Sequence, residues 1–194
     1  DGSIDWLCWP RFDSPAIFAA LLDADNGGYC SIRPSGEFES SRHYEEASNV
    51  LVTDFRSATG TARLTDSFFA TAEPLKHGRT IPQAMIVRRV ECLDGALDID
   101  VEVDPRLEFG RKRPRLRQRG AGSWTFPIRA GLVDIACDEP LREQQGRLCA
   151  STRLSEGGSL TLVLALNENE PAIFPPLQQA PALIEETNRY WKAW

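Results

Sequence analysis

Short segments in which apolar and polar residues alternate fill the middle of the chain. They are rich in β-branched residues, and an alternation of period two is typical of strands that bury one face. Eight segments fit this pattern: residues 49–55, 61–67, 84–92, 96–103, 123–128, 131–137, 148–154 and 159–166. Four short turn signals lie among them: Ala58-Thr59-Gly60, Asp94-Gly95, Gly120-Ala121-Gly122 and Gly157-Gly158. Turns of this length join antiparallel neighbours as hairpins, so the pattern predicts an all-β fold, an antiparallel β-sandwich.

Two helices are expected to frame the strands. Ser14 and Pro15 form an N-cap followed by proline at the first helical position, which predicts a short helix over residues 16–22. A second helix is expected from Pro181, with an apolar stripe of Leu183, Thr187, Tyr190, Trp191 and Trp194. Such a stripe needs a surface to cover it. We therefore expect a sandwich domain at 1–180, and a linker helix at 181–194 whose Tyr190, Trp191 and Trp194 make interdomain contacts.

Two ladders of opposite charge stand out in the strand pattern. Acidic residues occupy every second position at Asp98, Asp100, Glu102 and Asp104, and arginines do the same at Arg113, Arg115, Arg117 and Arg119. If residues 105–112 turn the chain, the two ladders lie on neighbouring exposed strands and pair across them. We therefore expect a solvated, charge-paired outer face here.

The charge balance of the 194-residue chain limits its partners. A net charge of -6 repels nucleic acid and anionic membrane surfaces, so neither is an expected partner. No apolar run approaches the roughly 20 residues that span a bilayer. The chain begins at Asp1 without a methionine, and its first residues are not those of a signal peptide. We expect residues upstream of this start.

The residue types that usually hold metals are scattered. Five cysteines, an odd number, include no C-x-x-C pair: Cys8, Cys30, Cys92, Cys137 and Cys149. Several lie in apolar alternating segments, where a free thiol behaves as a small hydrophobe, so we expect reduced thiols and a cytoplasmic protein. His43 and His77 each stand alone in polar segments. No metal site and no cofactor are therefore predicted.

Five segments carry a family resemblance. Residues 1–15 read DGSIDWLCWPRFDSP, and LTDSF at 64–68, VRRVECLDG at 87–95, DPRLEFGR at 104–111 and TNRYWKAW at 187–194 follow in order. Together they resemble the N-terminal domain of bacterial and archaeal family 15 glycoside hydrolases, the glucoamylases and trehalases. Leu107-Glu108 stands where the family usually has Phe-Asp, and Ser67-Phe68-Phe69 where it has Phe-Met-Pro. The roles of those family side chains are therefore not carried over.

The resemblance implies a β-sandwich of the supersandwich type, followed by an (α/α)6-barrel catalytic domain. Enzymes of this family are inverting, so one carboxylic acid protonates the glycosidic oxygen while a second carboxylate activates water. Both belong to the barrel in the family, so we expect no catalytic residue in this chain and no activity from it alone. The implied partners are its own barrel and, through that barrel, an α-glucan or trehalose. Glucoamylase and trehalase are not distinguished.

An indirect role is predicted for the segment from Trp9 to Asp13. It places an aromatic ring, a cation and an anion within five residues, a mixture that suits sugars because rings stack on pyranoses and charges hold hydroxyls. Two interpretations of Trp9, Arg11 and Asp13 stay open, substrate binding and interdomain contact. Trp6 and Phe12 are expected in the core.

Two other functions compete with a domain of a hydrolase. A stand-alone carbohydrate-binding module predicts a line of exposed aromatic residues along one sheet. A structural or regulatory sandwich predicts no sugar binding, and ligand titration separates the two.

Overall fold

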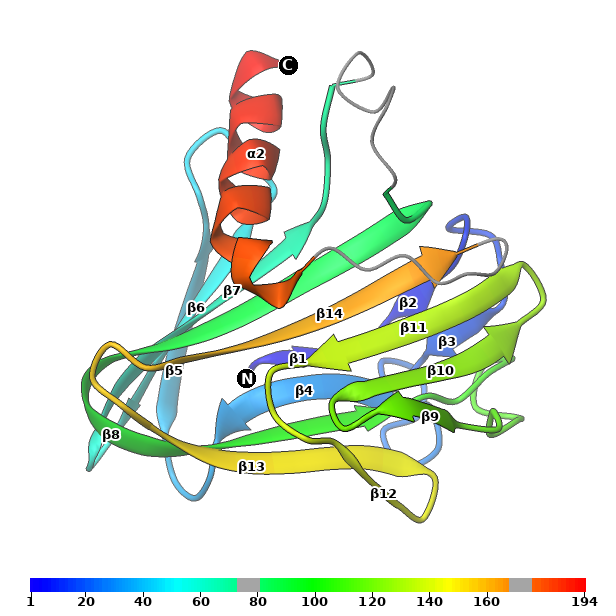
Figure 1. Ribbon diagram of the computed structural model, residues 1–194, viewed down its shortest axis with the longest axis horizontal. Helices are drawn as coiled ribbons and strands as arrows, with labels where there is room; N and C mark the ends of the chain where they lie inside the picture. The colour runs from blue at the N-terminus through cyan, green and yellow to red at the C-terminus, as the bar shows by residue number, and fades with distance from the viewer. Residues whose placement is uncertain (73–80, 168–175) are drawn as a thin grey trace.

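Two layers of antiparallel strands form the fold, which confirms the predicted β-sandwich (Figure 1). The computed structural model describes residues 1–72, 81–167 and 176–194. The larger layer has the order β5 (Glu39–Tyr44), β6 (Leu51–Ser57), β7 (Gly60–Phe68), β8 (Ala84–Asp104), β14 (Ser159–Asn167), β11 (Gly131–Cys137), β10 (Ser123–Ile128) and β9 (Arg117–Gly120). The second layer contains β1 (Ser3–Ile4), β4 (Tyr29–Pro34), the part of β8 from Ala96 onward, its neighbour β13 (Arg147–Ser155) and, beside β13, the short strand β12 (Arg142–Gln144). β2 (Leu7–Cys8) and β3 (Ala16–Phe18) form a separate pair.

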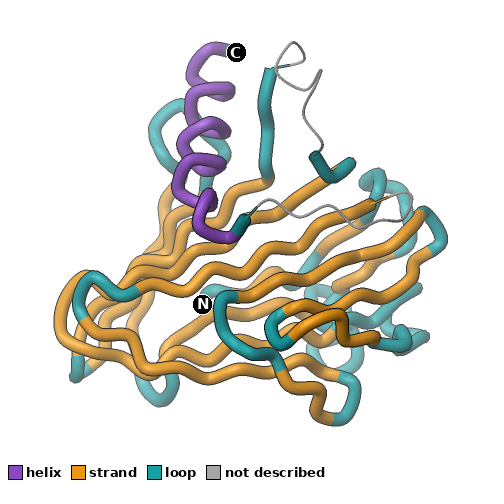
Figure 2. The backbone as a smooth tube through the Cα atoms, viewed as in Figure 1, coloured by secondary structure: helices purple, strands orange, loops and turns teal. Residues whose placement is uncertain are grey.

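Strand β8 joins the two layers, and Figure 2 shows it as a single long strand. Its 21 residues pair first with β7 and β14, then with β4 and β13. The hairpin predicted at Asp94-Gly95 is therefore wrong. Gly95 has φ +70°, and a Cβ there would lie 2.3 Å from the Thr59 carbonyl oxygen, so only glycine fits this bend. Strands that switch layers at a bend make the corners of such sandwiches.

The turn at Gly157-Gly158 follows the same corner. β13 and β14 on either side of it both pair with β8, in different layers, and do not pair with each other. The hairpin predicted there is also wrong. The turns at 58–60 and 120–122 do join paired neighbours, β6 with β7 and β9 with β10, as predicted.

The core lies between the two layers. Four alternate apolar residues in the second half of β8 point into it and are at most 2% exposed: Leu97, Ile99, Val101 and Val103. Phe55 and Phe126 of the other layer are buried in the same cluster. The alternation seen in the sequence thus reports correctly which face of β8 is buried.

The predicted pairing of the two charge ladders across neighbouring strands is wrong, although Arg113 lies 3.6 Å from Asp104. Arg117 lies on β9, which pairs with β10, whereas Asp98 lies in the opposite layer and binds Arg153 of β13 at 3.0 Å. Asp104 is buried, 2% exposed, and binds Arg106. Alternating charge shows that a strand has a polar face, but β4 and β13 compete for the edges of β8 and occupy both.

The predicted helix over residues 16–22 is also wrong. Residues 16–18 form strand β3, whose Ile17 carbonyl accepts a hydrogen bond from the Arg106 amide at 2.9 Å. The amide of Ala19, directly after β3, donates to the Gly27 carbonyl at 2.9 Å. All three residues of β3 are buried. A short apolar run buried on both faces has no periodicity that separates a helix from a strand.

The second predicted helix is present. After a 3-10 turn η1 (Leu177–Gln179), helix α2 (Ala180–Ala193) stands on the end of the larger layer (Figure 1). Its buried residues Ala180, Leu183 and Thr187 face β7, β8 and β14. The Thr187 hydroxyl accepts a hydrogen bond from the Ala70 amide at 3.3 Å.

A buried ion pair ties the N-terminus to both layers. Arg88 of β8 is fully buried and binds the Asp66 carboxylate of β7 through two nitrogens, at 2.7 and 3.1 Å. It also donates to the carbonyls of Cys30 at 2.5 Å and Gly2 at 2.8 Å. One guanidinium thus connects the residue before β1 with β4, β7 and β8. Three of the family-like segments, at 1–15, 64–68 and 87–95, meet at this side chain.

Candidate functional site

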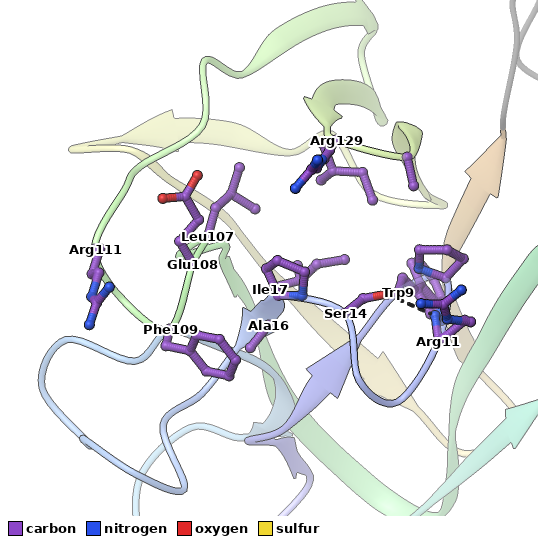
Figure 3. Close-up of a pocket in the computed structure, with 14 residues that line it drawn as sticks. Trp9, Arg11, Ser14, Ala16, Ile17, Leu107, Glu108, Phe109, Arg111 and Arg129 are labelled. Carbon is purple, nitrogen blue, oxygen red and sulfur yellow. Dashed lines mark hydrogen bonds between the residues drawn. The ribbon is translucent and has the colours of Figure 1, made fainter.

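A groove of about 570 Å³ opens at one end of the sandwich, between three loops (Figure 3). Its walls come from residues 9–17, 107–111 and 128–130, which lie far apart in the sequence. The buried residues Ile17 and Leu107 line it together with the half-buried Ile128. An apolar lining with charged groups at its edges is the usual composition of a small-molecule site.

The first wall is the loop that follows β2. Trp9 is buried, 3% exposed, and its ring meets the Phe68 ring edge-on at 6.4 Å between centroids. The Ser14 amide donates to the Arg11 carbonyl at 3.0 Å, and the Ser14 hydroxyl accepts from the Arg11 amide at 3.2 Å. Ser14 therefore closes this loop instead of capping a helix. The closed loop fixes Arg11 and Trp9 beside the groove.

Arg11 and Asp13 bind each other at the surface. The guanidinium donates to both carboxylate oxygens at 2.9 and 3.2 Å, with 75% and 53% of the two side chains exposed. The hydrogen bond from Arg11 lowers the pKa of Asp13, and the same bond raises the pKa of Arg11. Trp9 and Arg11 line the groove, while Asp13 reaches it only through Arg11.

The core positions expected for Trp6 and Phe12 are wrong. Phe12 is 92% exposed at the tip of the loop, and Trp6 is 40% exposed. Trp6 packs against Phe109, with 6.0 Å between ring centroids. An aromatic residue in a tight loop has no strand neighbour to cover it, so alternation with Asp5 and Asp13 does not bury it.

The second wall is a tight turn at residues 107–112, which was not among the predicted site residues. Leu107 and Lys112 bridge its base through both backbone hydrogen bonds, at 2.7 and 3.1 Å. Glu108 and Phe109 have φ of 55° and 60°, in the left-handed region that non-glycine residues rarely adopt. Gly110 follows with φ 87°. This backbone holds the half-exposed Phe109 ring at the edge of the groove (Figure 3).

A charge network supports the base of this turn. The Asp104 carboxylate binds Arg106 at 2.9 and 3.1 Å, and Arg147 and Arg113 approach it at 3.3 and 3.6 Å. Because the Arg106 amide also binds the Ile17 carbonyl, the turn is fixed to β3. The segment at 104–111 carries part of the family resemblance, and its composition is the sequence signal that could have indicated this wall. Arg129 of the third wall lies in the β10–β11 turn, and no sequence pattern pointed to it as a site residue.

Aromatic residues gather at the far end of helix α2. The Trp191 ring meets the rings of Tyr190 and Trp194 edge-on, with 5.3 and 5.8 Å between the respective centroids. Trp194 is 89% exposed. Tyr190, Trp194 and Thr71 line a hollow of about 480 Å³ beside the helix. The structure thus brings together the three predicted residues of this helix.

A family model for the trehalase-like N-terminal domain matches residues 1–127. The chain belongs to this family. The trehalase of Thermoplasma volcanium is 29% identical to it over the whole chain, which covers 30% of that enzyme. The trehalase of Thermoplasma acidophilum is 28% identical over the whole chain, which covers 33% of that enzyme. The trehalase of Mycobacterium tuberculosis is 24% identical over the whole chain, which covers 31% of that enzyme. The chain therefore spans about a third of the length of the relatives it matches.

The trehalase-like domain holds no metal cluster in the part of the chain that the structure describes. Over residues 1–72, 81–167 and 176–194, no group of three His, Cys, Asp or Glu side chains could hold an ion. His43 is exposed on β5, and His77 lies outside the described residues. No helix among the described residues is long and apolar enough to cross a membrane.

All five cysteines of the trehalase-like domain are free thiols. Cys30, Cys92 and Cys137 are buried, and burial raises the pKa of Cys137 to about 12. This thiol stays protonated at neutral pH and behaves as a core residue.

Proposed function

We propose that this chain is the non-catalytic N-terminal domain of an inverting glycoside hydrolase of family 15 that acts on α-glucosidic bonds. Residues 1–180 form the sandwich domain, and residues 181–194 lead as a linker helix into an (α/α)6 barrel that holds the catalytic carboxylates. The domain packs on this barrel and completes its entrance. The substrate is trehalose or an α-glucan.

This proposal rests on the small share of each related trehalase that the chain covers. The whole chain aligns with trehalases that are about three times as long. Most of the residues of those enzymes therefore lie outside the aligned part, and the family model describes the aligned part as N-terminal. A catalytic domain in the same polypeptide accounts for this difference in length.

The composition of the groove supports a non-catalytic role. Inversion requires two carboxyl groups roughly 6.5–9.5 Å apart, one as acid and one as base. The residues that line the groove include one carboxylate, Glu108. Asp13 beside it is already held by Arg11 in a two-point ion pair. The groove by itself does not supply the acid and base of the reaction.

Two surfaces support packing against a further domain. The aromatic end of α2 leaves Trp194 almost fully exposed, and large exposed apolar groups mark interaction sites. The loop with Arg11 and Phe12 lies at the same end of the molecule. Its Trp9 contacts Phe68, and the residues directly after Phe68 contact α2. We propose that Arg11, Asp13 and Trp9 contact the barrel or its substrate from this loop.

An activity assay tests the proposal. The 194-residue chain and the longer polypeptide that continues beyond Trp194 are incubated with trehalose, maltose and starch, and glucose release is measured. We expect release from at least one substrate by the longer polypeptide and none by the chain alone. Glucose release by the chain alone that a substitution within it abolishes would overturn the non-catalytic assignment. An inactive longer polypeptide would overturn the assignment to a hydrolase.

A further inference from the structure

The second and third walls together form the side of the groove opposite residues 9–17, and this wall carries charged side chains that have no partner among the described residues. Glu108, Arg111 and Arg129 make no hydrogen bond or ion pair with any other residue in the described ranges. By contrast, Arg11 on the near wall is held by Asp13. The turns at 107–112 and 128–131 thus present an acceptor and donors beside an apolar lining (Figure 3).

An aromatic ring completes this wall. Phe109 is 48% exposed, and Trp6 packs against one part of its ring, with 6.0 Å between the ring centroids. Its position depends on two successive non-glycine residues in the left-handed region, a conformation that is unfavourable for side chains with a Cβ. The turn is held in this form by the bridge between Leu107 and Lys112 and by the network around Asp104. The structure therefore maintains an unfavourable backbone that keeps a ring at the surface.

We propose that this wall of the groove is a binding subsite for an α-linked glucose disaccharide or the end of a longer glucan, separate from the hydrolytic site. Phe109 offers a face on which the apolar side of a pyranose stacks, as aromatic rings do with flat apolar partners. Glu108 accepts hydrogen bonds from sugar hydroxyls, while Arg129 and Arg111 donate to them. A groove of about 570 Å³ lies within the range of small-ligand sites, about 300–1,000 Å³.

The ligand class follows from the mixture of groups. The Glu108 carboxylate weakens the attraction of the two arginines for an anion, and the exposed arginines disfavour a purely apolar ligand. A neutral molecule with many hydroxyls uses both charges and the ring. The choice of glucose among sugars rests on the proposed function, whereas the groove and its polar groups do not.

Titration of the 194-residue chain tests this subsite. Maltose and trehalose are added while the backbone amide signals of residues 108–111 and 128–131 are followed by NMR, with sodium sulfate as the anionic probe. We expect saturable shifts at these residues with at least one sugar. Shifts with sulfate alone would show an anion site, and no saturable shift with either sugar would show that the wall binds neither. Both results overturn the proposal.

A glycine substitution separates the ring from the fold. Phe109→Gly removes the ring at a position whose φ of 60° glycine adopts readily, so relief of the left-handed backbone offsets the lost contact with Trp6 and the melting temperature should change little. We expect sugar affinity to fall about tenfold or more, the scale of one lost aromatic contact. Arg129→Gln and Glu108→Gln should weaken binding severalfold. Unchanged affinity in all three variants would overturn the assignment of the site to this wall.

Matched controls come from the other end of the sheet. Tyr44 on β5 is 65% exposed, and Arg56 on β6 is exposed. Tyr44→Ala and Arg56→Gln should leave the affinity unchanged. The assay of the longer polypeptide reports separately, because sugar binding without glucose release refutes the proposed function alone, and glucose release without sugar binding to the chain refutes the subsite alone.

Discussion

Two arginine–aspartate pairs of nearly the same geometry stand in opposite surroundings. Arg88 binds Asp66 at 2.7 and 3.1 Å, and Arg11 binds Asp13 at 2.9 and 3.2 Å. The Arg88 side chain is 0% exposed and its partner 15%, whereas the second pair is 75% and 53% exposed. The two pairs therefore have similar hydrogen-bond distances and differ in the solvent exposure of their side chains.

The difference assigns the pairs to different tasks. Burial opposes the charge on Arg88, and Asp66 and Cys30 more than offset it, so the pKa of Arg88 is raised. Removing one partner would leave a charge without water or counter-ion. Around Arg11, water replaces either partner at little cost. The buried pair thus belongs to folding, and the exposed pair is free to serve a contact outside the domain.

The largest expected effect comes from breaking the buried pair. Asp66→Asn should lower the free energy of unfolding by about 3–5 kcal/mol, because the Arg88 guanidinium remains buried and unpaired. Chemical denaturation of the 194-residue chain measures this loss. The control is Asp54→Asn, which breaks the half-exposed pair with Arg63 and should cost less than about 1 kcal/mol. Equal losses in the two variants would contradict the role of burial.

Removing both partners should cost less than removing one. In the double variant Arg88→Met and Asp66→Leu no charge is stranded, so we expect a loss of about 1–3 kcal/mol, from the Gly2 and Cys30 carbonyls that lose a donor. The same denaturation experiment gives the value. If the double variant were as unstable as Asp66→Asn, the hydrogen bonds to the carbonyls, and not the unpaired charge, would carry the stability.

The smallest effect on stability is expected at the exposed pair. Arg11→Ala should leave the melting temperature of the chain unchanged at neutral pH, while the pKa of Asp13 rises toward its ordinary value because the donor that lowers it is lost. A group with a lowered pKa stabilises the fold above its ordinary pKa and loses this effect as pH falls through the lowered value. With both side chains solvated in the folded chain, we expect no measurable change of melting temperature across that window.

The longer polypeptide should respond differently to the same substitution. There, Arg11→Ala is expected to lower glucose release or loosen the two domains, with Asp13→Asn as the matched partner variant. NMR titration of the Asp13 carboxyl and thermal melting of the chain provide the comparison. A strong loss of stability in the chain would place Arg11 in the folding of the sandwich and withdraw its interdomain role.

Much of the fold could be predicted because strand alternation is a local property. Seven of the eight predicted segments lie largely within β6, β7, β8, β10, β11, β13 or β14, and the eighth extends β8 beyond its bend. The errors concern how segments continue and pair. Asp94-Gly95 is a common turn signal. In the fold, however, Gly95 lies close against the Thr59 carbonyl, and β8 bends there and continues as one strand. The run from Ala16 to Phe18 is buried on both faces and carried no periodicity.

The candidate site was predicted only in part for the same reason. Trp9, Arg11 and Asp13 are close in sequence, so composition alone drew attention to them. Glu108 and Arg129 reach the groove because the turn at 107–112 is fixed to β3 and the β10–β11 turn lies beside it. The exposure of Phe12 could not be read from its neighbours, since it depends on a loop closed by Ser14.

By itself the sequence determined the class of fold, the inward face of β8, the C-terminal helix and the family. Each of these depends on residues near one another in the chain, where periodicity and motif spacing act directly. The tertiary structure alone decided which strands became neighbours, which of two similar ion pairs lost its water, and which loops met to form a groove. These depend on contacts between distant segments, whose choice is set by packing across the two layers and not by local pattern.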